Sequence, residues 1–184
     1  MRLPYAIVLL SSLVLFTSPL TADDKKKDSE KNANENKGVP AGHSNHGEAF
    51  NEGPRQKAYL MEGTGRVKFP ATTKKPLAQK FINQGVGQLH GFWFFEAERS
   101  FRQAASIDSD CAIAYWGMAM ANVNNDKRAR GFIAEAVKRK EPCTDREKRY
   151  IDALEAYIKA GSKKKKDRSQ KYAKALERIS YKYP

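Results

Sequence analysis

The chain has 184 residues and a formal net charge of +13, from 34 Lys or Arg against 21 Asp or Glu. Nearly all of this excess lies in residues 127–184, which hold nineteen basic and eight acidic side chains. Its densest run, the four lysines at 163–166, has no interleaved aromatic residues of the kind that stack on bases, so a solvated loop is favoured over a site for nucleic acid or another polyanion.

Residues 1–22 have the organisation of a secretory signal peptide. Arg2 gives a positively charged start, an apolar run occupies 6–16, and small or polar residues precede Asp23. The apolar run is shorter than the roughly 20 residues that a membrane-spanning helix needs, so a cleaved signal is favoured over an uncleaved anchor. We therefore expect the protein to be secreted or periplasmic.

Two segments without helical periodicity follow the signal. Residues 23–41 are rich in Lys, Asp, Glu, Asn and Ser, which predicts a disordered charged tether. Residues 42–75 contain apolar and aromatic side chains but are interrupted by Gly and Pro, so we expect an irregular cap segment with one helical turn near 55–59. This segment would lie across the first pair of helices and cover their apolar face.

Residues 76–184 show the periodicity of helices. In 78–111, apolar or small residues recur every three or four positions on either side of a tight turn at 90–92, which predicts two antiparallel helices. Two similar units follow at 112–143 and 144–184, the last opening with a capping-box sequence, Thr-Asp-Arg-Glu. A pair of helices of this length cannot bury its apolar face alone, so the units are expected to stack.

The first unit resembles the tetratricopeptide repeat, a helical hairpin of about 34 residues. The matching positions are Phe81, Gly85, Ala97, Phe101 and Ala104. The departures are Gln84, Gln88 and Ser109, where Leu, an aromatic residue and Pro are usual in the family. The resemblance, to the secreted or periplasmic bacterial type of the family, implies an all-α fold in which about three degenerate hairpins stack as a short solenoid.

The resemblance also implies a function, because stacked hairpins form a concave groove that binds a peptide or a partner protein. The candidate groove residues are the polar or aromatic positions of first helices that the packing signature does not use: Gln84, Gln88, Met118 and Asn122. The implied protein is an interaction scaffold with no catalysis of its own. Phosphate-binding glycine loops, nucleophile elbows and Cys-x-x-Cys pairs are absent from the sequence, in agreement with a protein that is not an enzyme.

The only candidate chemistry is the sequence GHSNHGE. His43 and His46 lie three apart, and Glu48 follows, so the three side chains offer two or three ligands to a divalent metal. A polar stretch that leads into the fold is the competing interpretation. The alternative function is therefore a metal-binding or redox-linked envelope protein; no other cofactor is expected. A further alternative is the N-terminal part of a larger multidomain protein, since no polar cap follows the third unit before Pro184.

Two consequences follow for side chains of the helical units. Cys111 and Cys143 fall at the last position of their units, which would separate them by about one helix-packing distance, ~8–10 Å, so two unpaired thiols are favoured over a disulfide, with Cys111 the more buried. The third unit, as the end of the stack, is expected to expose an apolar face. The residues of this face are Tyr157, Tyr172, Leu176 and Ile179.

Overall fold

The computed structural model describes residues 48–54, 57–161 and 165–184. They belong to the second of two units into which the chain divides, Gly38–Pro184. Over the described ranges the chain forms helices and no strand, which confirms the all-α class for this part of the protein. The predicted signal peptide, 1–22, and tether, 23–41, lie outside the described residues.

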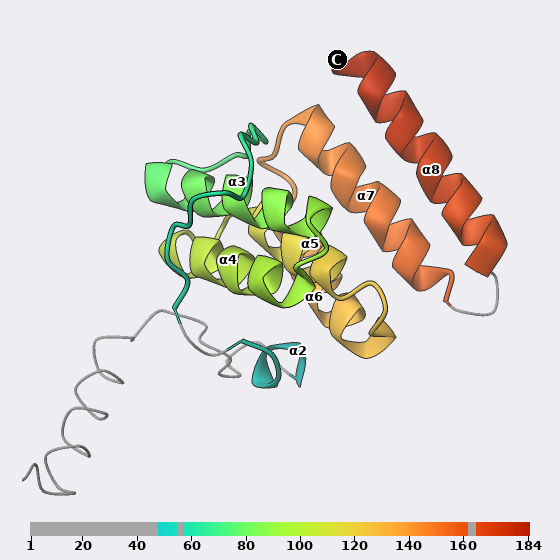
Figure 1. Cartoon of the computed structure of the whole chain (residues 1–184). Helices are drawn as coiled ribbons and strands as arrows, with labels where there is room; N and C mark the ends of the chain where they lie inside the picture. Colours follow the sequence, from blue (N-terminus) through green and yellow to red (C-terminus); the bar gives the residue numbers. More distant parts are fainter. Residues whose placement is uncertain (1–47, 55–56, 162–164) are drawn as a thin grey trace, which may run out of the picture. The chain divides into compact units, whose positions relative to one another are not determined.

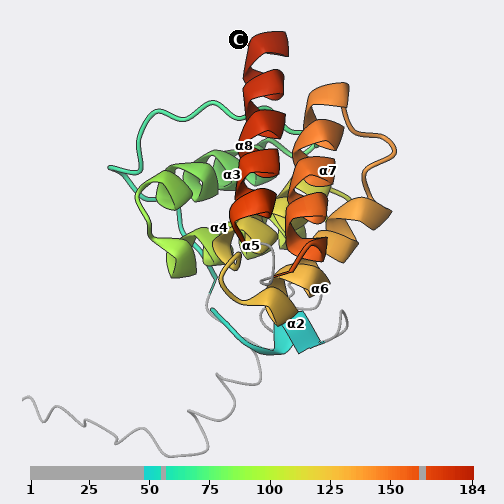
Figure 2. The same ribbon diagram turned by 90° about the vertical axis from the view of Figure 1, so that its right-hand side faces the viewer.

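The helices follow one another along the chain (Figure 1). Their bounds are α2 (Glu48–Asn51), α3 (Pro76–His90), α4 (Phe94–Ile107), α5 (Ala112–Ala121), α6 (Asp126–Lys138), α7 (Asp145–Lys159) and α8 (Lys165–Lys182). From α3 onward each helix packs against the next, and α5 also contacts α3 and α7. The short α2 packs against α6, and α7 and α8 lie side by side in both views (Figures 1 and 2).

Local sequence signals set the helix starts. Pro76 occupies the first turn of α3, where its missing N–H is not needed. The side chain of Asn125 accepts a hydrogen bond from the backbone N–H of Arg128 at the start of α6. At α7, Thr144 and Glu147 form the predicted capping box, in which each side chain bonds the backbone N–H of the other residue.

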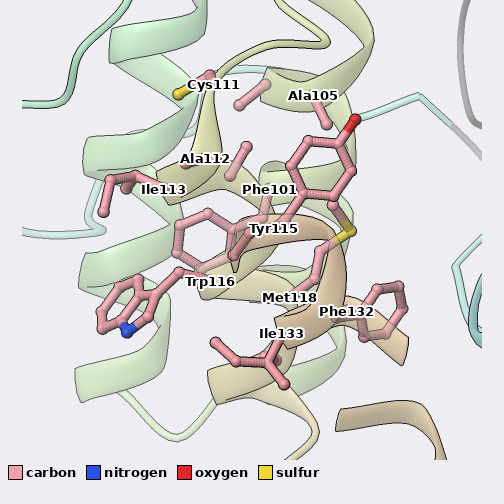
Figure 3. Packing of buried hydrophobic residues seen from close by; sticks show 14 of the residues in the cluster. Phe101, Ala105, Cys111, Ala112, Ile113, Tyr115, Trp116, Met118, Phe132 and Ile133 are labelled. Carbon is pink, nitrogen blue, oxygen red and sulfur yellow. The ribbon is translucent and has the colours of Figure 1, made fainter. Parts of the chain in front are cut away.

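The core is organised around Phe101 of α4, which is fully buried and lies among the large side chains of α5 and α6 (Figure 3). Its ring also lies against two glycines, Gly85 of α3 and Gly117 of α5. A Cβ atom at Gly117 would lie 2.3 Å from the ring, and one at Gly85 would lie 2.8 Å from it. The two glycines therefore let α3 and α5 both approach the same aromatic ring on α4.

The helical turn expected near 55–59 is not found in its described part, because residues 57–75 contain no helix; residues 55 and 56 lie outside the described residues. A helical turn lies earlier, in α2 at Glu48–Asn51. A long-range contact explains the difference: Phe50 is fully buried, with its ring centroid 4.9 Å from that of Phe132 and 6.2 Å from that of Tyr115. Burial of this aromatic side chain fixes α2 on α6, and local sequence carries no sign of it.

The expected exposed apolar face of the third helix pair is also corrected. Ile179 is 3% exposed, and Tyr157, Tyr172 and Leu176 are half-buried. The hydroxyl of Tyr172 donates to the sulfur of Met120 at 3.3 Å, and burial raises the pKa of this tyrosine above its ordinary value. The apolar stripe of α8 thus faces inward along α7 and reaches the helices behind it.

Both cysteines are free and buried, as predicted. Cys111 is 1% exposed and Cys143 is 8% exposed, so Cys111 is the more buried of the two. Burial raises the pKa of the Cys111 thiol to about 12 and that of the Cys143 thiol to about 11. Both side chains therefore pack as small apolar groups, with little thiolate at neutral pH.

The contact between Phe101 and Gly117 predicts the effect of a single methyl group. Gly117→Ala is expected to destabilise the fold by about 1–3 kcal/mol, because the added methyl group would lie 2.3 Å from the buried ring of Phe101 and would have to displace it. Gly91→Ala is the matched control: Gly91 ends α3 with φ −81°, and a Cβ there would meet its nearest atoms at 3.5 Å. Urea denaturation measures both; equal midpoints for the two variants would contradict the packing described.

The raised pKa of Cys111 predicts a loss of stability in alkali. Its thiol has an ordinary pKa of 9.0 when unfolded and about 12 when folded, so the unfolded chain loses its proton first. The free energy of unfolding is unaffected well below pH 9 and falls between the two pKa values. At about pH 10, ionisation of Cys111 in the unfolded chain lowers it by about 1 kcal/mol. Cys111→Ala should show a shallower decline of unfolding free energy above about pH 9. A decline as steep as that of the unaltered protein would refute this.

Candidate functional site

Residues 57–73, here called the strap, form a non-helical segment that turns at 62–64, where Gly63 has φ 81°, and leads into α3 (Figure 1). Every residue of the strap is half-buried or exposed, and none is fully buried. The strap therefore lies on the helices and is not part of their core. Most of the side chains that hold it come from α3, α5 and α7, the first helices of the three pairs; Asp108, directly after α4, also accepts a hydrogen bond from the hydroxyl of Thr73.

Gln84 of α3 holds the beginning of the strap. Its Nε2 donates to the carbonyl of Tyr59 at 2.9 Å, and its Oε1 accepts from the backbone N–H of Met61 at 2.7 Å. A carboxamide that pairs with both a backbone donor and a backbone acceptor acts as a strand partner would, so this contact is independent of the strap's side chains. Ser100 of α4 accepts a further bond from Gln84 and fixes its orientation.

Two further amides of α3 hold the middle of the strap. The Oδ1 of Asn83 accepts from the backbone N–H of Phe69 at 3.1 Å. Gln79 donates to the carbonyl of Phe69 at 2.8 Å and accepts from the N–H of Ala71 at 2.9 Å. Gln79 and Asn83 also bond each other at 2.9 Å, so the pair forms one connected hydrogen-bonding surface along α3.

Residues of α7 hold the end of the strap. Glu147, which is 1% exposed, accepts from both the backbone N–H and the hydroxyl of Thr72 at 2.6 Å each. The same carboxylate caps α7 through Thr144. Arg146 donates to the carbonyl of Pro70 at 2.6 Å. The start of α7 thus recognises a hydroxyl-bearing residue and not only the backbone.

One strap side chain enters an aromatic pocket. The ring of Phe69 stacks on Trp116 of α5, with centroids 5.5 Å apart and an interplanar angle of 7°. It also lies 5.3 Å from the ring of Tyr150 of α7, while the guanidinium of Arg146 lies 4.8 Å from the ring centroid of Phe69. Aromatic and cation–π contacts of this kind each contribute about 0.5–1.5 kcal/mol beyond burial.

The strap backbone approaches α3 most closely at Gly87. A Cβ atom at this position would lie 2.1 Å from the carbonyl oxygen of Thr64. Only glycine is compatible with this approach, so the side of α3 that meets the strap is shaped for a backbone. The arrangement as a whole can hold an extended chain by its peptide groups, with one aromatic side chain and one hydroxyl read specifically.

The structure places the four predicted groove residues in the interior. Gln84 and Gln88 lie beneath the strap, where Gln88 accepts from Ser100 and donates to the sulfur of Met61. Met118 is fully buried in α5 and Asn122 is 8% exposed. Two of the four therefore contact an extended segment, which is the chain's own.

Asn122, directly after α5, belongs to a buried ionic cluster. Its amide donates to Glu98 at 2.9 Å and its carbonyl oxygen accepts from Arg128 at 2.6 Å. Glu98 also pairs with Arg102, and both arginines donate to the carbonyl of Glu52, which follows α2. The cluster thus fastens α2 to the helices and leaves Asn122 no role in the strap groove.

Sequence reasoning missed Gln79, Asn83 and Glu147 as strap ligands. Gln79 and Asn83 lie four apart, a spacing that places two amides on the same face of a helix, and this was the available signal. Glu147 was recognised only as a helix cap. Its second task involves Thr72, which is 75 residues away in sequence.

The predicted metal ligands cannot be brought together from the described residues. His43 and His46 lie outside them, and Glu48 opens α2 without a described side chain. In the ranges that the structure describes, no group of three or more His, Cys, Asp or Glu is placed to hold a metal ion. The metal site stays a prediction.

Comparisons with protein-family models, curated proteins and solved structures gave no match for this chain. Among the helices of the described ranges, none has the length and apolar character needed to cross a membrane.

The contacts of Phe69 with Trp116 and Tyr150 predict that opening of the strap depends on the Phe69 ring. Phe69→Ala is expected to speed amide hydrogen exchange at Met61, Ala71 and Thr72 by about tenfold or more, since an opening free energy lowered by about 1.4 kcal/mol gives that factor. Exchange within α4 to α6 should not change. Lys68→Ala, at the exposed neighbouring position, is the control. Unchanged exchange in the Phe69 variant would show that the pocket does not hold the strap.

Proposed function

We propose that this protein is a non-enzymatic interaction scaffold, acting outside the cytoplasm, that binds an extended peptide or an extended segment of a partner protein along α3, α5 and α7. In this proposal the units 78–111, 112–143 and 144–184 stack as a short tetratricopeptide-like solenoid. The contacts of α5 with both α3 and α7 support this stacking, because they place the first helices of successive pairs next to one another.

One observation carries the proposal: the first helices hold an extended chain through its peptide groups. Gln79, Asn83 and Gln84 together bond backbone groups at four strap residues, while Phe69 and Thr72 contribute side chains to the contacts with α5 and α7. A surface of this type accepts a foreign peptide as readily as its own segment, provided that the peptide is extended and carries suitable groups at two positions.

The two side-chain contacts define the preferred ligand. The Phe69 pocket requires an aromatic residue, and Glu147 requires a residue with a hydroxyl three positions later. Between them, Pro70 contributes its carbonyl, and none of the contacts requires an N–H at that position. The ligand is therefore an extended segment of the form aromatic-Pro-small-Thr or Ser.

A ligand has to displace the strap, and the structure of the strap permits this. Its residues are at most half-buried, whereas Phe50, a few residues upstream, is fully buried and stays fixed on α6. A displaced strap remains attached and competes at an effective concentration in the range of about 1 mM for a short flexible linker. A partner therefore has to bind tightly enough to outcompete the attached strap.

Binding of the strap sequence in trans tests the proposal. A labelled peptide of residues 57–74 should bind the full chain carrying Phe69→Ala, whose own strap is weakened, and should bind the unaltered chain about tenfold or more weakly because of competition within the molecule. Fluorescence anisotropy measures both. The same peptide with Phe69→Ala and Thr72→Ala is the matched control and should lose binding.

The circular-dichroism spectrum of the Phe69→Ala chain serves as the folding control for this experiment. If the Phe69→Ala chain keeps its helical circular-dichroism spectrum and does not bind the unaltered peptide, the face of α3, α5 and α7 is not a peptide-binding site. Equal binding of the control peptide would show that the aromatic pocket and Glu147 do not select the ligand.

A further inference from the structure

A second candidate site lies between α7 and α8, away from the strap. A pocket of about 410 Å³ opens there, and its lining includes Ala153 and Ala156 of α7, Ala160 directly after α7, and Ala175 of α8. Ala153, Ala156 and Ala160 are spaced by three and four residues, and Ala160 keeps a right-handed helical backbone, so the three lie along one face of α7 and its C-cap. Ala156 and Ala160 are exposed, which leaves the floor of the pocket open to a ligand.

Arg168 of α8 lines this pocket and is buried without a matching acceptor. Its side chain is 7% exposed, and its guanidinium lies 4.4 Å from the ring centroid of Tyr157. Its Nε and Nη1 atoms are buried with no hydrogen-bond partner, and the nearest carboxylate that pairs with it, Asp126, is 3.9 Å away. A buried cation is costly unless it is paired and hydrogen-bonded, and neither Asp126 nor Asp167, the acidic residue of the pocket lining, accepts a hydrogen bond from these two atoms.

The helix that carries Arg168 is predominantly basic, and Asp167 is the acidic residue of the pocket lining. The helix α8 contains seven Lys or Arg and two Asp or Glu over 165–182. Lys171 also lines the pocket, with its side chain 76% exposed and paired only with Asp167 on the same helix. A ligand that brings carboxylates to this rim would meet a complementary field.

The shape of the pocket favours a helical ligand over an extended one. An extended chain needs a partner for each buried peptide group, as the strap receives from the amides of α3. The pocket presents alanines, tyrosine rings, the cations of Arg168 and Lys171 and the carboxylate of Asp167, but no carboxamide. A helix satisfies its own peptide groups, and alanine floors allow two helices to approach within about 8–10 Å.

We propose that the pocket between α7 and α8 binds an amphipathic helix of a partner protein whose small or apolar stripe is flanked by Glu or Asp. The stripe packs on Ala153, Ala156 and Ala160, and a carboxylate at its edge accepts hydrogen bonds from Arg168. Lys171 supplies a second, exposed contact to the acidic flank. This site is independent of the strap groove, so either can be occupied alone.

A defined peptide tests this site on the full chain. The probe is a labelled alanine- and leucine-rich helical peptide of about 16 residues with Glu along both sides of its apolar stripe, and the matched probe has Gln at each Glu position. The acidic probe should bind saturably, and the Gln probe about tenfold or more weakly. Binding of the acidic probe should weaken with added salt.

Three exposed positions give variants that leave the core intact. Ala156→Leu fills the pocket and should weaken binding of the acidic probe by about tenfold or more, and Lys171→Gln should weaken it by about threefold or more. Lys174→Gln removes one charge from the same helix outside the pocket lining and should have no effect. Arg168→Gln should abolish binding, with its helical spectrum measured alongside.

Several results would overturn the proposal. They are absence of saturable binding to the folded full chain, equal binding of the acidic and Gln probes, and equal weakening by Lys174→Gln and Lys171→Gln, which would indicate general charge attraction. Self-association of the chain that Ala156→Leu abolishes would show that a second copy, and not an acidic helix, occupies the pocket.

Discussion

The contact of Phe101 with two glycines is the constraint on which the other features depend. Because Gly85 and Gly117 carry no side chain, α3 and α5 both lie against one ring of α4. That close approach places the first helices of successive pairs side by side. Gln84 and Trp116, which contact the strap, lie one residue before those two glycines. The contact of both glycines with Phe101 therefore also sets how far apart the strap-holding residues of α3 and α5 lie.

The two described parts of the chain before α3, namely α2 and the strap, are attached to these helices by different physical means. The short α2 is fixed by burial of Phe50 and by arginines that bond carbonyls near its end. The strap is fixed mainly by hydrogen bonds to its backbone and by one half-buried ring. The first attachment buries a whole aromatic side chain and the second does not, so opening of the strap without loss of α2 is the expected order of events.

Features set by nearby residues could be predicted from the sequence, and features set by distant residues could not. Helix periodicity, the Asn125 and Thr144 caps and the burial of Phe101 follow from spacings within about 34 residues. The path of the strap depends on pairs such as Thr72 with Glu147, 75 residues apart. Gln84, polar where the repeat family usually has Leu, was a signal of such a distant partner: a buried amide has to be hydrogen-bonded, and it bonds the strap.

The central claim, that α3, α5 and α7 form a groove for extended peptides now held by the strap, is tested most directly by nuclear magnetic resonance of the isotope-labelled full chain. Titration with an unlabelled peptide of the form aromatic-Pro-small-Thr should shift the side-chain amide signals of Gln79, Asn83 and Gln84, while strap amides move to the positions of an unfolded segment. Shifts confined to other surfaces, with strap signals unchanged at saturation, would contradict the account.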